Sequence, residues 1–161
     1  MRMDRFTVKS QEVLGNAQEL AKKAEHPEVS PEHLLMALLT QDGAPTPAIV
    51  TTVGADIARV KEATQEALDT KATVQGLAAE LYFSTKTRRI LDEAWKEAQE
   101  PEDAYMSTEH LLIAIARDKD SAAGKLLRKQ GVSAPKILDA LESIRGGQKV
   151  EDPNAEDKYQ S

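Results

Sequence analysis

Apolar residues recur at intervals of three and four positions along most of the chain, which is the spacing of an α-helix. From Thr7 to Ala24, valine, leucine and alanine form one such stripe, and the stretch from Ser84 to Ala98 repeats it. No run of useful length alternates between apolar and polar residues, as a half-buried strand would. The pattern therefore predicts an all-α fold.

Serine residues mark the start of the second helix in each half of the chain. Ser30 precedes Pro31, which suits the first position of a helix, and Ser107 stands at the matching place later on. His33 and His110 follow these serines by three positions, where a strict capping box has Glu or Gln. We therefore expect serine N-caps without that reciprocal box.

Two further helices are indicated in each half. The third would end at Gly54 or Gly131, because glycine readily adopts the left-handed conformation that stops a helix. The fourth would begin at Asp56 or Ser133, whose side chains are good N-caps. A connector over about 69–81 then joins the two sets of four helices.

The two halves of the chain are similar in sequence at a constant offset of 77 positions. Residues 29–39, VSPEHLLMALL, recur as residues 106–116, MSTEHLLIAIA. Without any gap, residues 6–67 match residues 83–144 at 14 of 62 positions. Such a duplication predicts eight helices in two pseudo-twofold-related four-helix repeats, at about residues 6–68 and 83–144.

The composition changes after Arg145. Residues 146–161 are polar and contain glycine and proline, with few apolar residues to pack in a core. We therefore expect one repeat domain over residues 1–145, followed by a flexible linker over residues 146–161 that leads to a further module.

Composition and charge exclude several classes of function. The chain has no cysteine, which rules out thiol catalysis and thiolate metal sites. Its longest apolar runs have six residues, far short of the ~20 that cross a bilayer. With 21 basic against 27 acidic residues the net charge is -6, which disfavours binding to phosphate backbones. No signal peptide opens the chain, so we expect a cytoplasmic protein without a nucleic-acid or membrane partner.

No motif predicts a catalytic, metal or cofactor site. The histidines lack the spacing of a zinc helix, and Gly124-Lys125 lacks the rest of a phosphate-binding loop. Trp95 falls at the edge of a predicted apolar stripe, so we expect it to be partly buried. Tyr82, Phe83 and Tyr105 lie near predicted helix starts, where they could either seal the junction between the halves or contact a ligand.

The duplicated motifs resemble a known family. PEHLL at 31–35, STEHLL at 107–112, the opening MRMDRFTVKSQ and the tail RGGQKVEDPNAEDKY at 145–159 are similar to the amino-terminal Clp repeat domain of the ClpB chaperones, the bacterial disaggregases of the AAA+ class. The repeat motif alone would also fit the protease-coupled ClpA and ClpC unfoldases, whose amino-terminal domains dock adaptors. The opening and the tail look more like ClpB.

The resemblance implies a binding module that has no enzymatic activity or cofactor of its own. It would bind exposed apolar segments of unfolded or aggregated polypeptides, in a groove between the repeats, during recovery from heat stress. Modules outside this chain would bind ATP and magnesium, carry a coiled coil, form a homohexamer and cooperate with the DnaK system.

The resemblance also suggests where such a groove lies. The family positions that line it map onto Thr7, Asp103 and Glu109, which match the family here. Flanking residues expected to contribute are Tyr82, Phe83, Tyr105, His110 and Ile113. Where relatives would place leucines on the fifth helix, this sequence has Glu93 and Glu97, which we expect to alter the groove.

Overall fold

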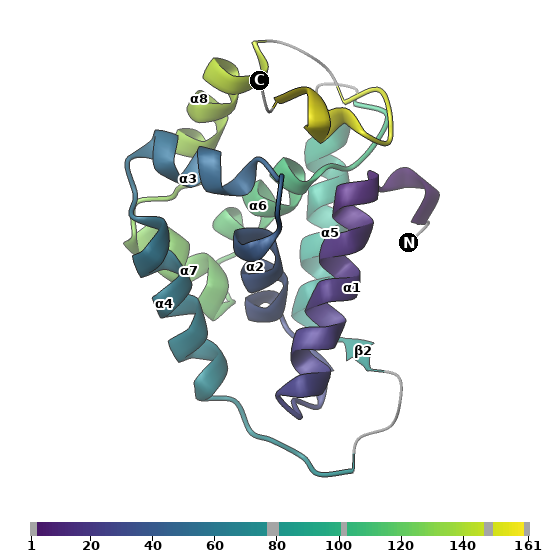
Figure 1. Ribbon diagram of the computed structural model, residues 1–161, viewed down its shortest axis with the longest axis vertical. Coiled ribbons are helices and arrows are strands. Elements are labelled where there is room, and N and C mark those ends of the chain that lie inside the picture. The colour runs from purple at the N-terminus through teal and green to yellow at the C-terminus, as the bar shows by residue number, and fades with distance from the viewer. Residues whose placement is uncertain (1–2, 77–80, 101–102, 147–149, 160–161) are drawn as a thin grey trace.

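The computed structural model describes residues 3–76, 81–100, 103–146 and 150–159, and eight α-helices make up most of this part of the chain (Figure 1). In the first half these are α1 (Val8–Lys23), α2 (Pro31–Thr40), α3 (Thr46–Val53) and α4 (Ile57–Asp69). In the second half they are α5 (Thr85–Gln99), α6 (Thr108–Arg117), α7 (Ala122–Lys129) and α8 (Ala134–Arg145). The prediction of an all-α fold with eight helices is confirmed.

The helix ends lie close to the predicted positions because local side chains and glycines fix them. The Thr7 hydroxyl accepts a hydrogen bond from the Ser10 N–H at the start of α1, and Asp56 accepts one from Ala58 at the start of α4. Gly54 ends α3 in the left-handed conformation, with φ of 97°.

Histidines complete the N-terminal caps of α2 and α6. The Ser30 N–H donates to His33 Nδ1 at 2.9 Å, and the His33 N–H donates back to the Ser30 hydroxyl at 3.4 Å. The Ser107 N–H donates to His110 Nδ1 at 2.9 Å in the same way. The expectation that these caps lack the reciprocal box is wrong, because an imidazole acceptor performs the function that Glu or Gln has in the usual capping box.

The two repeats interlock. Within each half α1 packs against α2 and α5 against α6, but α3 packs against α8 and α4 against α7 across the halves. Helices α2 and α6 contact each other at the centre, and residues 31–39 and 108–116 are buried. The predicted four-helix repeats therefore share one core.

Two short parallel pairings join the halves. Strand β1 (Glu28–Val29) pairs with β2 (Tyr82–Phe83), and an isolated bridge joins Phe6 to Met106. Phe6 and Phe83 are equivalent at the offset of 77, as are Val29 and Met106. The bridge and the Val29–Phe83 pair thus exchange equivalent partners, as a pseudo-twofold axis requires, and both are too short to produce an alternating sequence pattern.

The prediction of a flexible linker is wrong for residues 150–159, which we call the tail. The tail folds back onto the domain (yellow in Figure 1) and ends in a 3₁₀ helix, η2 (Ala155–Tyr159). Val150, Ala155 and Glu156 are buried, so this polar segment still supplies two apolar residues and one acid to the interior. Residues 147–149, 160 and 161 of the expected linker lie outside the described residues.

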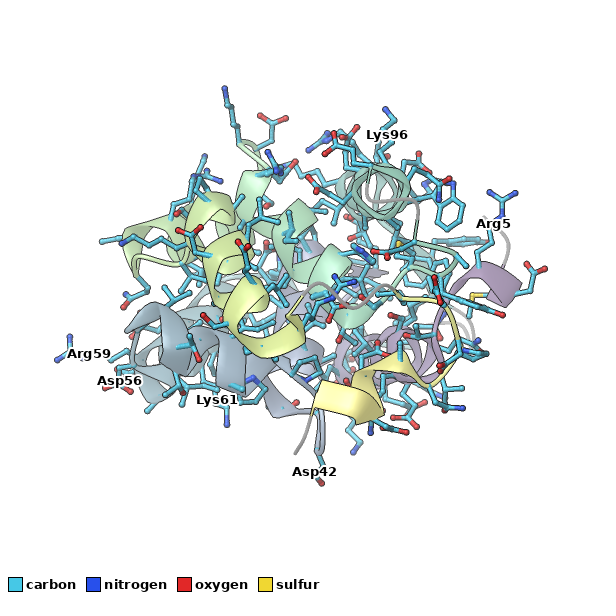
Figure 2. All side chains as sticks on the ribbon, turned by 90° about the horizontal axis from the view of Figure 1, so that it is seen from above. Arg5, Asp42, Asp56, Arg59, Lys61 and Lys96 are labelled. Carbon is cyan, nitrogen blue, oxygen red and sulfur yellow. The ribbon has the colours of Figure 1, made fainter. Side chains whose placement is uncertain are left out.

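The molecular surface is charged, as the side chains of Arg5, Asp42, Asp56, Arg59, Lys61 and Lys96 illustrate in Figure 2. Trp95 is partly buried against the core, as predicted, and the Arg5 guanidinium lies 4.7 Å from its ring centroid. None of the helices in the described ranges is long and apolar enough to cross a membrane.

Candidate functional site

The repeats meet at two crossings. At the first, which we call the tail crossing, residues 5–10 meet residues 103–110. The Thr7 N–H donates to the Met106 carbonyl at 3.0 Å, and the Met106 N–H donates to the Arg5 carbonyl at 2.7 Å. At the second, the open crossing, the Ser84 N–H donates to the Val29 carbonyl at 2.9 Å. Thr7 and Ser84 are equivalent positions of the repeat, so the two crossings are built alike.

The structure separates the predicted site residues into two groups. Thr7, Asp103, Tyr105, Glu109 and His110 lie at the tail crossing, with Ile113 one turn further along α6. Tyr82 and Phe83 form β2 at the open crossing. The site predicted from the sequence therefore combines residues that belong to two different crossings.

Most of these side chains do not line an open groove. Five are at most 2% exposed: Thr7, Asp103, Glu109, His110 and Ile113. Phe83 and Tyr105 are partly buried, whereas Tyr82 is 82% exposed. The expectation that Thr7, Asp103 and Glu109 face an accessible groove is wrong for this conformation, because the tail and the neighbouring helix ends cover them.

Asp103 connects α6 to the tail. Its Oδ2 lies 3.0 Å from His110 Nε2, and its Oδ1 accepts a hydrogen bond from the Val150 N–H at 2.8 Å. The Arg145 guanidinium lies 3.5 Å away. Burial by itself would raise the pKa of Asp103, but the hydrogen bonds from His110 and Val150 and the nearby charges hold that pKa below its usual value.

Glu109 is a fully buried carboxyl beside this network. The Ser107 hydroxyl donates to its Oε1, and Arg145 Nη1 lies 3.8 Å from the same oxygen. Its Oε2 has no hydrogen-bond partner among the described residues. Burial raises the pKa of Glu109, and the neighbouring Glu156 carboxyl raises it further, against the lowering effect of His110, Ser107 and Arg145.

The tail supplies a second buried carboxyl, which the sequence did not suggest as part of a site. Glu156 Oε2 accepts hydrogen bonds from the Thr7 hydroxyl at 2.6 Å and from the Thr108 N–H at 3.0 Å. Burial raises the pKa of Glu156 in spite of these bonds. The main chain of the tail is bound as well, since the Val8 N–H donates to the Pro153 carbonyl at 2.8 Å.

The open crossing contains a groove of about 550 Å³. It lies between the first residues of α2, α5 and α7, and Lys71 forms an ion pair with Glu32 at 2.7 Å on its wall. Nearby, His26 Nδ1 lies 2.8 Å from His33 Nε2, where the second repeat has Asp103 and His110. Burial, His26 and Lys71 lower the pKa of His33 to about 4.

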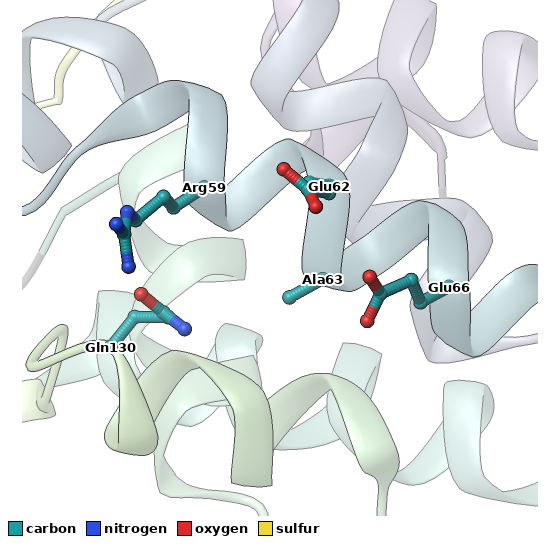
Figure 3. A pocket seen from close by; sticks show the side chains of 5 residues that line it. All are labelled: Arg59, Glu62, Ala63, Glu66 and Gln130. Atoms are coloured by element: carbon teal, nitrogen blue, oxygen red, sulfur yellow. The ribbon is translucent and has the colours of Figure 1, made fainter.

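A second hollow lies elsewhere, between α4 and the end of α7 (Figure 3). It measures about 350 Å³, and its lining residues are Arg59, Glu62, Ala63, Glu66 and Gln130. It contains none of the predicted site residues. In the described ranges no group of three histidine or acidic side chains could hold a metal ion.

The two glutamates of α5 lie outside both crossings' hydrogen-bond networks. Glu97 forms an ion pair with Arg117 on α6, and Glu93 forms one with Lys96 on its own helix at 3.2 Å. Their expected effect on substrate preference therefore stays a prediction.

Comparisons with known proteins agree with this architecture. The model of the Clp repeat (R) N-terminal domain matches residues 5–130. The chain is 38% identical over 161 residues to the chaperone protein ClpB of Vibrio cholerae, with all of this chain and 19% of that protein covered. The chain thus spans about a fifth of the length of that relative.

Solved structures show the same fold. The N-terminal domain of Hsp104 from Candida albicans has a TM-score of 0.80 at 23% identity, with 94% of this chain and 98% of that chain covered. A complex of the ClpV N-domain with a VipB peptide has a TM-score of 0.69 at 21% identity, covering 90% and 89% respectively.

The family match extends over most of the chain and includes both crossings. A domain of this kind is a binding module rather than a catalytic domain. With its duplicated helices, its exchanged pairings and this match, the chain belongs to the Clp repeat (R) N-terminal domain family.

Proposed function

We propose that this chain is the substrate-engaging domain of a ClpB-type disaggregase, and that it binds exposed segments of unfolded or aggregated polypeptides at the tail crossing. One observation carries the proposal. The tail crossing already binds a polypeptide segment, residues 150–157, through main-chain hydrogen bonds as well as buried side chains.

The chemistry of this surface suits many sequences. Val8 and Ala104 donate main-chain N–H groups to carbonyls of the tail, at 2.8 and 2.9 Å, and every polypeptide has such carbonyls. Burial of an apolar residue, as of Val150, is non-directional. A single site of this kind binds weakly, so several copies held together would act by avidity.

The relatives support this proposal. A ClpV N-domain, which shares the fold, has been solved with a VipB peptide. In the complete protein, AAA+ modules would bind ATP and magnesium, form a hexamer and work with the DnaK system in the cytoplasm. This chain would then supply contact with the substrate during the stress response.

A titration with a permanently unfolded protein tests the proposal. The chain is mixed with a fluorescently labelled, reduced and carboxymethylated protein, and anisotropy is recorded, with the native form of the same protein as control. We expect saturable binding of the unfolded form with a Kd on the order of micromolar, and no binding of the native form. Binding of a folded adaptor but of no unfolded chain would favour the adaptor-docking function of ClpA and ClpC instead.

A further inference from the structure

The tail crossing contains a notch that binds a carboxylate at the starts of two helices. Thr7 is the N-cap of α1 and donates its hydroxyl to Glu156, and Thr108 is the first residue of α6 and donates its main-chain N–H. The positive ends of helix dipoles favour an anion at such a place. The Glu156 side chain is fully buried, so this contact is not a loose surface pairing.

Two more anchors lie along the same segment. Six positions before Glu156, the main chain of Val150 is bound on both sides, because its N–H donates to Asp103 and its carbonyl accepts from Ala104. Between them, the Pro153 carbonyl accepts from Val8. The crossing therefore recognises an apolar residue, a carbonyl and a carboxylate in a fixed order.

Two features of residues 150–157 indicate that another peptide segment can displace them. Only residues 147–149 separate it from Gly146, where α8 ends, so its local concentration at the notch is high, about millimolar. Its fit is incomplete, since Glu156 Oε1 is buried without a hydrogen-bond partner in the described part of the chain. An incoming segment with a better-satisfied carboxylate would compete with it.

We infer that the tail crossing is a binding site for carboxylate-bearing peptide segments of other polypeptides, and that residues 150–157 of this chain are its built-in competitor. This inference deepens the proposed function and rests on it, because it names a class of segment that the domain binds. Binding of such a segment requires release of the tail.

The two repeats differ at the main-chain N–H that donates to the Glu156 carboxylate. Pro31 stands at the open crossing where Thr108 stands at the tail crossing, and proline has no N–H to donate. The open crossing therefore lacks one of the two donors that bind Glu156. The substitution Thr108→Pro copies this difference, and the extended conformation of Ser107, with φ of -100° and ψ of 174°, accommodates a following proline.

A labelled peptide with the sequence of residues 149–159, KVEDPNAEDKY, tests the inference in the 161-residue chain. We expect the variant Glu156→Ala to bind this peptide about tenfold more tightly than the unsubstituted chain, because its own tail competes less well. The matched control Asp157→Ala removes the same charge from an exposed neighbour and is expected to bind like the unsubstituted chain. Adding Thr108→Pro to Glu156→Ala is expected to reduce binding at least tenfold.

Equal peptide binding by the unsubstituted chain and by Glu156→Ala would overturn the inference. So would equal binding of a second peptide in which glutamine replaces the glutamate at the eighth position, the one that corresponds to Glu156. Circular dichroism establishes that each variant is folded. The unfolded-protein titration separates the two proposals. If unfolded protein binds but Glu156→Ala gains nothing, only the competitor role fails, and if no unfolded protein binds while the peptide results hold, the substrate-engaging function fails.

Discussion

His33 and His110 cap equivalent helices but face different partners. His33 lies beside His26, with Lys71 and Glu32 near, whereas His110 lies beside the carboxylate of Asp103. Burial and the neighbouring imidazole of His26 both disfavour protonation of His33. The same capping residue is therefore sensitive to acid in the first repeat.

The sign of this effect follows from the pKa of His33, which is about 4 in the folded chain against 6.5 for the ordinary side chain. The folded state favours the neutral form of His33, so the contribution of His33 to stability is complete above pH 6.5 and is lost as the pH falls from 6.5 towards 4.

The variant His26→Asp gives His33 the partner that His110 has. We expect it to lose less stability than the unsubstituted chain between pH 7.5 and pH 5, measured by urea unfolding.

An equal loss of stability in both proteins over this range would contradict the proposed origin of the acid sensitivity. Asp103, Glu109 and Glu156 also titrate, but they are present in both proteins, so the difference between them isolates the His26–His33 pair.

Among the helices, α7 shows how closely elements approach one another. Gly124 lies in its first turn, and a Cβ placed there would be 2.2 Å from the Asp118 carbonyl oxygen and 2.7 Å from that of Ile115. Both obstacles are main-chain atoms, which cannot move aside as a flexible side chain does. By contrast, Gly15 in α1 is exposed and has no atom within 4 Å of such a Cβ.

Substitution of each glycine by alanine is expected to give opposite results. Gly124→Ala should destabilise the chain by about 1–3 kcal/mol through overpacking. Gly15→Ala should stabilise it by roughly 0.5–1 kcal/mol, because glycine within a helix loses more conformational freedom on folding. Thermal and urea unfolding measure both. A neutral Gly124→Ala would show that the α6–α7 junction is looser than described.

The elements themselves were predictable from sequence because their signals are local. Helical periodicity, the N-cap Asp56 and the left-handed Gly54 act within a few residues, and the structure has each of them in place. The tail was not predictable in this way. Val150 and Glu156 become buried only through partners more than 40 positions away, and glycine, proline and charge around them are typical of a linker.

The candidate site was predicted only in part for a similar reason. The motif resemblance indicated Thr7, Asp103 and Glu109, and these do lie at one crossing. Their burial was not foreseeable, because it depends on the tail docking over them. Thr108 could have been noticed, since it is the position at which the duplicated motif changes from proline to a residue with an N–H.

The packing of the two repeats against each other determines how the whole molecule unfolds. Since α3 packs on α8 and α4 on α7, each half leaves apolar faces uncovered without the other. We expect the chain to unfold in one cooperative transition when followed by circular dichroism and by Trp95 fluorescence, and a peptide of residues 1–76 alone to show none. Two separate transitions, or a folded isolated half, would contradict the shared core.

The central claim, that polypeptides bind at the tail crossing, is tested most directly by ¹H–¹⁵N NMR of the chain during titration with an unfolded polypeptide. The amide signals of Val8, Ala104, Thr108 and Val150 should shift together and saturate together, because the first three donate to the tail that a ligand displaces and Val150 belongs to that tail. Shifts confined to the hollow at Arg59 and Gln130, with these four signals unchanged, would contradict the claim.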